Sequence, residues 1–422
     1  MRNASLWRTL LGVEKTVIDE VEFDEDEQLL VAHVRPRTQA RSRARCGRCG
    51  RRAAAYDRGE GRRRWRTLDL GTVRVMLEAD APRVDCPEHG PTVAAVPWAR
   101  HGAGHTSAFD EQVAWLATQC SKSAACELMR IAWRTVGAII TRVWDDVEAL
   151  HDQFAGLRRI GIDEISYKRG HRYLTVVVDH DSGRLVWAAP GRDKATLAAF
   201  FDALGPERCA AITHVSADGA DWISAVVTDR CPNAVRCADA FHVVRWATDA
   251  LDEVRRQAWN EARGAVTQRR AGRASGHAKA LKHARYALWK NPEHLTERQQ
   301  QKLAWVARTD PRLHRAYLLK EGLRLVFRLA HEEAAEALER WISWARRSRI
   351  PAFVALQLRI VKHKASILAA IKHRLSNGRI ESVNTKIRLI TRVAFGFKSP
   401  QALIALAMLN LGGHRPALPG RT

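Results

Sequence analysis

Hydrophobic and polar positions change their spacing several times along the chain, and each change predicts a different kind of element. Residues 16–34 hold two apolar runs on either side of an acidic tip, which predicts a β-hairpin. Residues 73–79 alternate apolar and polar side chains, as a half-buried strand does. The N-terminal part of the chain is therefore expected to be rich in β-structure.

From residue 107 the apolar positions recur every three or four residues, which is the period of a helix. The pattern divides into a short helix over residues 121–130, a turn, and a longer helix over residues 134–147. An ordinary helical hairpin would give the same pattern. A helix-turn-helix motif would put Arg134 and Thr135 at the N-terminal end of a recognition helix, where the edges of DNA bases are reached.

Short strand-like runs alternate with helical ones over residues 159–236, with one strand expected over residues 210–218 and a crossover helix over residues 194–204. This order is typical of an α/β fold. From about residue 240 to residue 375 the pattern is helical throughout. Tryptophans of that region, such as Trp289, Trp305, Trp341 and Trp344, are expected in its core.

The charge of the chain points to nucleic acid as its first candidate partner. Its 422 residues include 69 basic and 46 acidic ones, which gives a formal net charge of +23. An arginine-rich chain can also come from a GC-rich genome, but here the charge is uneven. Residues 35–66 carry 13 arginines and two acids, and residues 359–398 carry ten basic residues and one acid, Glu381.

The same composition excludes several classes of protein. A hydrophobic content of 46% is enough for several cores and excludes wholesale disorder. No apolar stretch approaches the roughly 18–20 residues that span a membrane, and the N-terminus lacks a secretion signal. The eight cysteines are too few for a disulfide scaffold and fit a reducing compartment. We therefore expect a soluble, multidomain protein of the cytoplasm.

Two short motifs near the N-terminus have the spacing of metal ligands. Cys46 and Cys49 are separated by two residues, and so are Cys86 and His89. Two such pairs complete the tetrahedral Cys3His set that structural Zn²⁺ prefers, so we expect one zinc ion that holds a small domain together. Two unrelated, redox-active cysteine pairs would be the alternative.

Arginines surround the first of these motifs. Their density suggests contacts with the DNA backbone. They are Arg41, Arg43, Arg45, Arg48, Arg51 and Arg52.

Three acids stand out by their context. Asp163 and Asp218 each follow a predicted strand, and Glu381 lies alone among basic residues. Carboxylates are the ligands that Mg²⁺ prefers, and the surrounding bases would hold the phosphates of a substrate. A lone carboxylate of this kind is otherwise an ordinary salt-bridge partner.

Glu381 belongs to a predicted amphipathic helix that follows Gly378. Its buried stripe is expected to contain Ile380, Val383, Ile387 and Ile390. The opposite face carries Glu381, Thr385, Arg388 and Arg392, and Lys386 follows Thr385 in the sequence. Lys386, Arg388 and Arg392 are expected to bind DNA.

The segments IGIDE…YLTVVVD, VSADG, DAFHVV and SNGRIESVNTKIR…RVAFGF occur in this order along the chain. Together they resemble the DDE transposases of bacterial insertion sequences, and among these the IS-L-three family, which also has an N-terminal Cys/His zinc motif followed by a helix-turn-helix. The resemblance covers about residues 40–413. One difference is Gly219, where the family pattern leads us to expect a larger apolar residue.

This resemblance implies a multidomain α/β protein. Its RNase H-like catalytic core would be interrupted by an all-helical insertion and preceded by the small zinc-binding domain and the helix-turn-helix domain. Asp163, Asp218 and Glu381 would be the catalytic residues and would hold two Mg²⁺ (or Mn²⁺) ions per active site. Asp239 and His242 match the Asp-x-x-His element of the family and would have an accessory role.

The partners implied by the resemblance are double-stranded DNA, as terminal inverted repeats and as target, and further copies of the chain in a homodimer or higher oligomer. The reaction implied is metal-dependent strand cleavage followed by 3′-hydroxyl strand transfer. The domains expected are residues 1–100 (zinc-binding, β-rich), 101–155 (helix-turn-helix), 156–245 (first part of the core), 246–370 (helical insertion) and 371–413 (last part of the core).

Other assignments remain open at this stage. Asp239 could replace Asp218 as the second metal ligand, and Glu164 is a weaker candidate because it should point to the opposite face of its strand from Asp163. The chain could also be a non-catalytic DNA-binding regulator, a decayed transposase, or an RNase H-like nuclease of the host. His242 could equally be a structural histidine.

Overall fold

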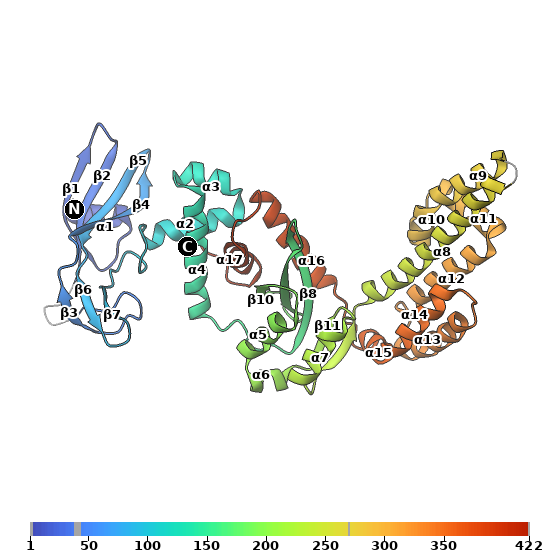
Figure 1. Ribbon diagram of the computed structural model, residues 1–422. Helices are drawn as coiled ribbons and strands as arrows, with labels where there is room; N and C mark the ends of the chain where they lie inside the picture. Colours follow the sequence, from blue (N-terminus) through green and yellow to red (C-terminus); the bar gives the residue numbers. More distant parts are fainter. Residues whose placement is uncertain (1–2, 38–43, 269–270, 421–422) are drawn as a thin grey trace. The chain divides into compact units, whose positions relative to one another are not determined.

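The computed structural model describes residues 3–37, 44–268 and 271–420 (Figure 1). The chain forms two units, the first made of residues 1–152 and 389–422 and the second of residues 153–388. The boundary at residues 388 and 389 falls inside one helix. Within the described part of the chain, no helix combines the length and the apolar character needed to cross a membrane.

The first unit begins with helix α1 (Asn3–Leu11) and a four-stranded sheet. The predicted hairpin is confirmed, because β1 and β2 pair in antiparallel register. The sheet buries Trp65 against Trp98, with ring centroids 5.6 Å apart. Its strand order is β1 (Thr16–Asp24), β2 (Leu29–Pro36), β5 (Val73–Asp80) and β4 (Arg62–Leu70). A smaller sheet follows, with β3 (Ala54–Asp57), β6 (Arg83–Cys86) and β7 (Gly90–Val93).

Helices α2 (Ser107–Gln119), α3 (Lys122–Met129) and α4 (Trp133–Leu150) come next, close to the predicted boundaries. Ser121 caps α3 by accepting a hydrogen bond from the backbone of Ala124, and Arg130 ends it in the left-handed region at φ 52°. The fully buried Asp110 of α2 accepts two hydrogen bonds from Arg142 of α4, at 2.8 and 2.9 Å. This charge-assisted pair fixes α2 against α4.

Helix α17 (Pro400–Leu411), at the other end of the chain, completes the first unit. It packs against α2 and α4. Its apolar residues are buried around most of its circumference, which is the pattern of a core helix. The C-terminal segment thus belongs to the helix-turn-helix region.

The second unit contains a five-stranded sheet of order β10-β9-β8-β11-β12. β9 pairs with β8 and β10 in antiparallel register, whereas β11 runs parallel to β8 and β12. The strands are β8 (Arg159–Lys168), β9 (Arg172–Asp179), β10 (Leu185–Pro190), β11 (His214–Ala217) and β12 (Val235–Ala238). The neighbouring helices are α5 (Lys194–Leu204), α6 (Pro206–Ala211) and α7 (Asp221–Arg230).

The prediction of a strand over residues 210–218 is wrong at its start. Residues 210 and 211 end helix α6, and the strand begins only at His214. Pro206 stands at the first turn of α6, where its fixed φ favours a helix and its missing N–H costs nothing. The helical start at Pro206 decides the conformation of the apolar residues that follow it.

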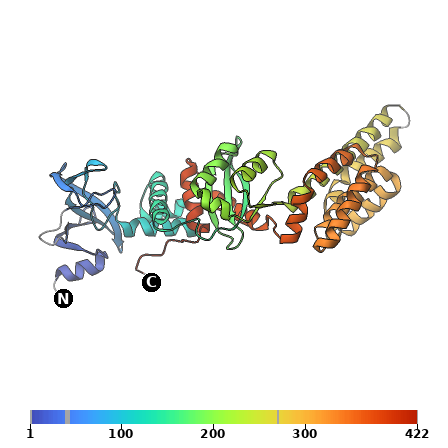
Figure 2. The ribbon, with the colours of Figure 1, turned by 90° about the horizontal axis from the view of Figure 1, so that it is seen from below.

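The predicted helical region is confirmed, and Figures 1 and 2 show its helices lying side by side. Trp341 is buried and donates from Nε1 to the carbonyl of Leu319 at 2.7 Å, and Trp289 and Trp305 pack partly buried against the same core. The expectation for Trp344 is wrong, because 38% of its surface is exposed. The elements are α8 (Ala240–Gln268), α9 (Ala271–His283), α10 (Arg285–Trp289), η1 (Pro292–His294), α11 (Glu297–Thr309), α12 (Pro311–Val326), α13 (His331–Arg346), α14 (Pro351–Lys362) and α15 (Lys364–His373).

Helix α16 (Gly378–Val393) then returns to the sheet, as the pattern of its apolar residues predicts. Ile380, Val383 and Ile387 are buried, and Ile390 is half-buried. A side chain at Gly161 of β8 would place its Cβ 2.2 Å from Ile380 Cδ1. The glycine therefore lets the first turn of α16 lie directly on the central strand.

Candidate functional site

The four predicted zinc ligands meet in one cluster. Their ligand atoms lie within 4.8 Å of one another. Cys86 Sγ lies 3.7 Å from both Cys49 Sγ and His89 Nδ1, and Cys46 Sγ lies 3.9 Å from His89 Nδ1. Zn–S distances of about 2.3 Å and a Zn–N distance of about 2.0–2.1 Å put the ligand atoms of a tetrahedral site about 3.5–3.8 Å apart. The donor set therefore fits one Zn²⁺ ion held through His89 Nδ1.

The local structure around the cluster favours metal binding. Cys86 ends β6 and His89 immediately precedes β7, so the turn between the two strands carries this pair of ligands. The Arg48 N–H donates to Cys46 Sγ at 3.4 Å. The hydrogen bond from His89 lowers the pKa of the Cys86 thiol, which favours the thiolate that binds metal. A site with four protein ligands leaves no open position and acts in stability.

The arginines near this cluster differ in their contacts. Arg45 Nη1 donates to the Gly50 carbonyl at 2.8 Å, and Arg51 pairs with Glu88 at 3.1 Å. Arg48 and Arg52 are exposed. Arg41 and Arg43 lie outside the described residues.

Arg134 and Thr135 are the second and third residues of α4. Arg134 is exposed and Thr135 is half-buried. This is the position that base-contacting residues occupy in a recognition helix.

Asp163 lies in β8, and Asp218 directly follows the neighbouring parallel strand β11. β8 and β11 pair with Gly161 opposite Ser216, and two residues further along each chain come Asp163 and Asp218. Burial raises the pKa of the Asp163 carboxyl, and the nearby Asp239 and Asp218 raise it further, whereas the backbone N–H of Glu164 and the charge of His242 act against this. These acids are therefore close enough to repel one another electrostatically.

Helix α16, which carries Glu381, contacts the sheet beside these two acids. Asn384 Nδ2 donates to Asp163 Oδ2 at 2.8 Å, and Asn377 Oδ1 accepts from the Ser216 hydroxyl of β11 at 2.6 Å. Glu381 precedes Asn384 by three residues on α16, so the two share one face of the helix, and Asn377 lies one residue before the helix begins. The Glu381 side chain itself is exposed.

Sequence reasoning missed Asn384, which is 2% exposed. Its Oδ1 atom is buried and has no hydrogen-bond partner among the described residues. A buried asparagine next to the apolar stripe of an amphipathic helix was the available signal, since buried polar groups need partners.

The three acids are more widely spaced than the zinc ligands. Among the described residues, the Cys3His cluster is the one group of three or more candidate ligands whose atoms all lie within 4.8 Å of each other. Two ions in a phosphoryl-transfer site lie about 3.5–4 Å apart, so ligands of different ions need not be this close.

Asp239 and His242 form a hydrogen-bonded pair close to Asp218. His242 Nδ1 lies 2.6 Å from Asp239 Oδ2 and 4.0 Å from Asp218 Oδ1. The hydrogen bond with Asp239 raises the pKa of His242. The other Asp239 oxygen accepts from the Phe241 N–H at 3.1 Å, so both carboxylate oxygens of this buried residue are engaged. Asp218 is half-buried and accepts from the Gly219 N–H at 2.6 Å.

The glycine that departs from the family pattern has a steric reason. A Cβ at Gly219 would lie 2.7 Å from Cζ2 of Trp246 in α8. The ring of Trp246 thus occupies the space that a larger residue after Asp218 would need.

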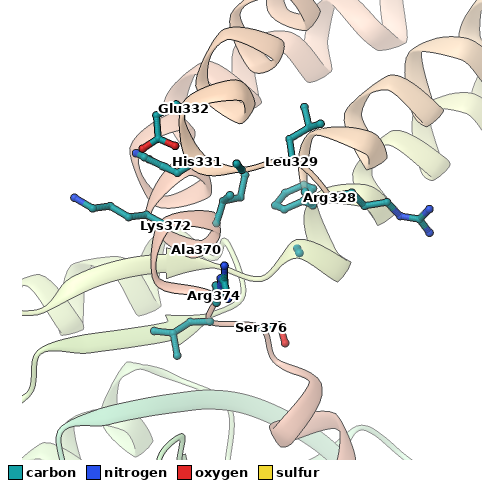
Figure 3. A pocket seen from close by; sticks show the side chains of 13 residues that line it. Arg328, Leu329, His331, Glu332, Ala370, Lys372, Arg374 and Ser376 are labelled. Atoms are coloured by element: carbon teal, nitrogen blue, oxygen red, sulfur yellow. The ribbon is translucent and has the colours of Figure 1, made fainter.

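Basic side chains also lie on α16 and around a cavity of the second unit. Lys386, Arg388 and Arg392 are all exposed on α16. A cavity of about 650 Å³ lies between the start of α13 and the end of α15, and its lining includes Ala240 and Ser376, the neighbours of Asp239 and Asn377. Figure 3 shows Lys372 and Arg374 at this cavity.

His180 supports the position of α16 through Ser216. Because the Ser216 hydroxyl donates to Asn377, His180 Nε2 donates to Ser216 Oγ, at 2.6 Å. His180 is 4% exposed, and burial, reinforced by Arg379 and Arg159, lowers its pKa to about 4. The chain His180–Ser216–Asn377 therefore holds α16 with a neutral histidine.

Loss of one zinc ligand should unfold the small domain. We expect Cys49→Ser to reduce the zinc content of the purified protein from about one ion per chain to near zero and to lower its melting temperature, since zinc binding contributes to folding. Metal analysis and thermal unfolding measure both effects. Cys120→Ser, outside the cluster, is the matched control and should keep the zinc; equal zinc content in the two variants would contradict the assignment.

Acidification should loosen α16. With a folded pKa of about 4 against an ordinary 6.5, His180 contributes stability that is complete above pH 6.5 and is lost as the pH falls towards 4. From pH 7 to pH 5 the loss is about 2 kcal/mol. Hydrogen exchange of the α16 amides at the two pH values measures it. His180→Gln should show less of this pH dependence, and an unchanged dependence would contradict the prediction.

Three family profiles match successive parts of the chain. Residues 42–89 match the zinc-finger of transposase IS204/IS1001/IS1096/IS1165, and residues 94–144 match the helix-turn-helix domain of transposase family ISL3. Residues 160–407 match a transposase profile of the same family. The helix-turn-helix reading of α3 and α4 is thereby confirmed over an ordinary helical hairpin.

Individual relatives agree with these profiles. The transposases for insertion sequence element IS1557 from two strains of Mycobacterium tuberculosis, CDC 1551 / Oshkosh and ATCC 25618 / H37Rv, are each 67% identical over 438 aligned positions, which cover 100% of this chain and 98% of the relative. The transposase for insertion sequence element IS1001 from Bordetella parapertussis is 26% identical over 405 positions, which cover 95% of this chain and 96% of the relative. The chain therefore belongs to the ISL3 family of insertion-sequence transposases, the family that its motifs resemble.

Proposed function

We propose that this transposase cleaves and joins DNA with Asp163, Asp218 and Glu381 as the ligands of two Mg²⁺ (or Mn²⁺) ions. The observation that carries this proposal is the docking of α16 on the sheet. Asn384 contacts Asp163, and Asn377 contacts β11 just before Asp218. Glu381 lies on the helix face between these two contacts.

The residues at this edge fit a divalent cation. Carboxylates and amide oxygens are hard ligands of the kind that Mg²⁺ takes. Burial and the neighbouring acids raise the pKa of Asp163, and the unpartnered Asn384 Oδ1 is a further oxygen close by. A bound cation would stabilise the charged form of Asp163 and give Asn384 Oδ1 a partner.

The strand order supports an RNase H-like core. Three antiparallel strands, β10, β9 and β8, continue into the parallel strands β11 and β12. Asp218 directly follows the carboxyl end of β11, where α/β sheets bind their ligands, and Asp163 lies beside it in the middle of β8, which continues to Lys168 instead of ending at Asp163 as the sequence predicts. The helices from α8 to α15 would then be an insertion between the fifth strand and the helix that carries the last acid.

Bound ions would activate a water or a 3′-hydroxyl and stabilise charge on the phosphate. The chain itself holds these groups in place. Asn384 fixes the orientation of the Asp163 carboxylate, and His242, with its raised pKa, offers a positive charge beside Asp218. Lys386 and Arg388 would bind the phosphates that flank the scissile bond.

Recognition of double-stranded DNA would belong to the first unit. Arg134 and Thr135 would read the terminal inverted repeats, and Arg45, Arg48 and Arg51 would bind the backbone. Arg392 of α16 would add to these contacts. A homodimer or higher oligomer would pair the two ends, and the reaction would occur on the DNA of the bacterial cytoplasm. The five domains expected from the sequence would divide these tasks.

A non-catalytic regulator or a decayed transposase is the second candidate function. The zinc cluster and the helix-turn-helix would serve it equally well. It gives no reason for Asn384 to be directed at Asp163 or for acids to meet at one edge of the sheet.

Removal of a metal ligand should abolish cleavage and leave DNA binding intact. We expect Asp163→Asn and Glu381→Gln to slow Mg²⁺-dependent cutting of duplexes that carry the element ends at least about 100-fold, equivalent to about 2.7 kcal/mol in the barrier. Cleavage and gel-shift assays measure the two activities.

The matched controls are Asp229→Asn and Glu336→Gln, at side chains that are 78% and 77% exposed. They should cut normally. Normal cutting by Asp163→Asn or Glu381→Gln would refute the site, and no cutting by the parent in Mg²⁺ or Mn²⁺ would favour the second candidate.

Asn384→Ala should weaken metal binding because it removes the partner that orients Asp163. Loss of such a partner costs about 10- to 100-fold in metal affinity or activity. The half-saturating Mg²⁺ concentration for cleavage should therefore rise. Asn233→Ala, which loses an exposed bond to the Ala210 carbonyl, is the control. A lower rate with an unchanged Mg²⁺ requirement would contradict the positioning role.

A further inference from the structure

A cavity of about 480 Å³ lies in the first unit, where three helices begin. Its lining includes the first residue of α3, the cap and first two residues of α4, and the capping residue of α17. Each helix N-terminus contributes partial positive charge. No acidic residue is among those that line the cavity, and Arg134 and Lys398 add two cations to it.

Lys122 is the buried charge of this cavity. The residue is 4% exposed, and its ammonium lies 5.0 Å from the ring centroid of Trp133 and 4.8 Å from that of Phe397. No hydrogen bond or ion pair joins it to another residue in the described part of the chain. Its Nζ faces α4, 3.6 Å from where a Cβ at Gly137 would lie.

Burial lowers the pKa of Lys122, and the nearby Cys126 thiol counteracts this only in part. Contacts with aromatic rings offset some of the cost of burying an ammonium, but less than an anion would. A lysine that is buried, uncompensated and directed into a cavity therefore points to an anionic ligand.

The start of α4 offers further donors. Its capping residue, Ala132, makes no side-chain hydrogen bond, whereas Ser121 and Ser399 cap α3 and α17 with theirs. The first N–H groups of α4 thus lack a side-chain acceptor. Helix N-termini of this kind bind phosphate through their backbone donors.

We propose that this cavity binds one backbone phosphate of the element-end DNA, held by Lys122 and the N-terminus of α4. The inference rests on the DNA-reading role proposed for the helix-turn-helix. Arg134 and Lys398 would lie at the rim, on either side of the strand. Phe397 and Ser399 precede α17, so the C-terminal segment of the chain is part of the DNA-binding module.

The phosphate can be located with modified DNA. A duplex carrying the terminal repeat is synthesised with a single neutral methylphosphonate at successive positions, and its binding to the full-length protein is measured. At one position the methylphosphonate should lower the DNA affinity of the parent protein about tenfold, because one phosphate contact is lost. The same methylphosphonate should not change the DNA affinity of Lys122→Met. On unmodified DNA, Lys122→Met should lower the slope of log affinity against log salt by about 0.9.

Thermal unfolding separates this role from a structural one. Lys122→Met removes an uncompensated buried charge and should leave the melting temperature unchanged or higher. A second test uses Ala138, an exposed residue of the cavity lining, and compares the DNA binding of Ala138→Glu with that of Ala138→Gln. The glutamate should weaken DNA binding more than the glutamine, because it offers Lys122 a competing carboxylate.

The effect of inorganic phosphate on the melting temperature, measured at matched ionic strength, tests whether the cavity binds free phosphate instead of DNA. If it raises the melting temperature of the parent but not of Lys122→Met, while no methylphosphonate position depends on Lys122, the cavity binds free phosphate and the proposal is overturned. Equal DNA affinity and salt dependence in parent and Lys122→Met would also overturn it. Both readouts measure binding, so they are independent of whether Asp163 and Glu381 support cleavage.

Discussion

The contact between α16 and the central sheet is the constraint on which the catalytic unit depends. Three residues make it: Asn377, just before the helix, bonds to Ser216, Ile380 lies on Gly161, and Asn384 bonds to Asp163. Without this contact, Glu381 would have no fixed relation to acids that precede it by more than 160 residues. The intervening chain is folded into helices with their own core, which avoids the entropy of closing a long flexible loop.

The electrostatics of the site follow from the same contact. The helix lies on β8 and contacts the half-buried Asp163, and partial burial together with the neighbouring acids disfavours its negative charge. Asp239 and His242 form a hydrogen-bonded pair that raises the pKa of His242, which favours its protonated form beside Asp218. The site therefore combines a carboxylate that burial destabilises, Asp163, with bases on α16 and around the adjoining cavity.

Features encoded by local spacing could be predicted from the sequence. The zinc ligands, the helix-turn-helix and the amphipathic helix around Glu381 each depend on residues a few positions apart, or on two short motifs with one shared chemistry. The partners of the acids could not be predicted, because Asn384, Ser216 and His180 meet only through the register of β8 with β11 and the docking of α16. The same applies to Gly219, which is explained only by the position of Trp246.

The central claim is that segments around Asp163, Asp218 and Glu381 surround one divalent-metal site. Replacement of Mg²⁺ by Fe²⁺ in the full-length protein, with ascorbate and peroxide, generates hydroxyl radicals that cut the backbone next to the bound ion. The account predicts cuts near residues 163, 218 and 381 that excess Mg²⁺ suppresses. Cuts near 163 and 218 without one near 381, or cutting that Mg²⁺ does not suppress, would contradict it.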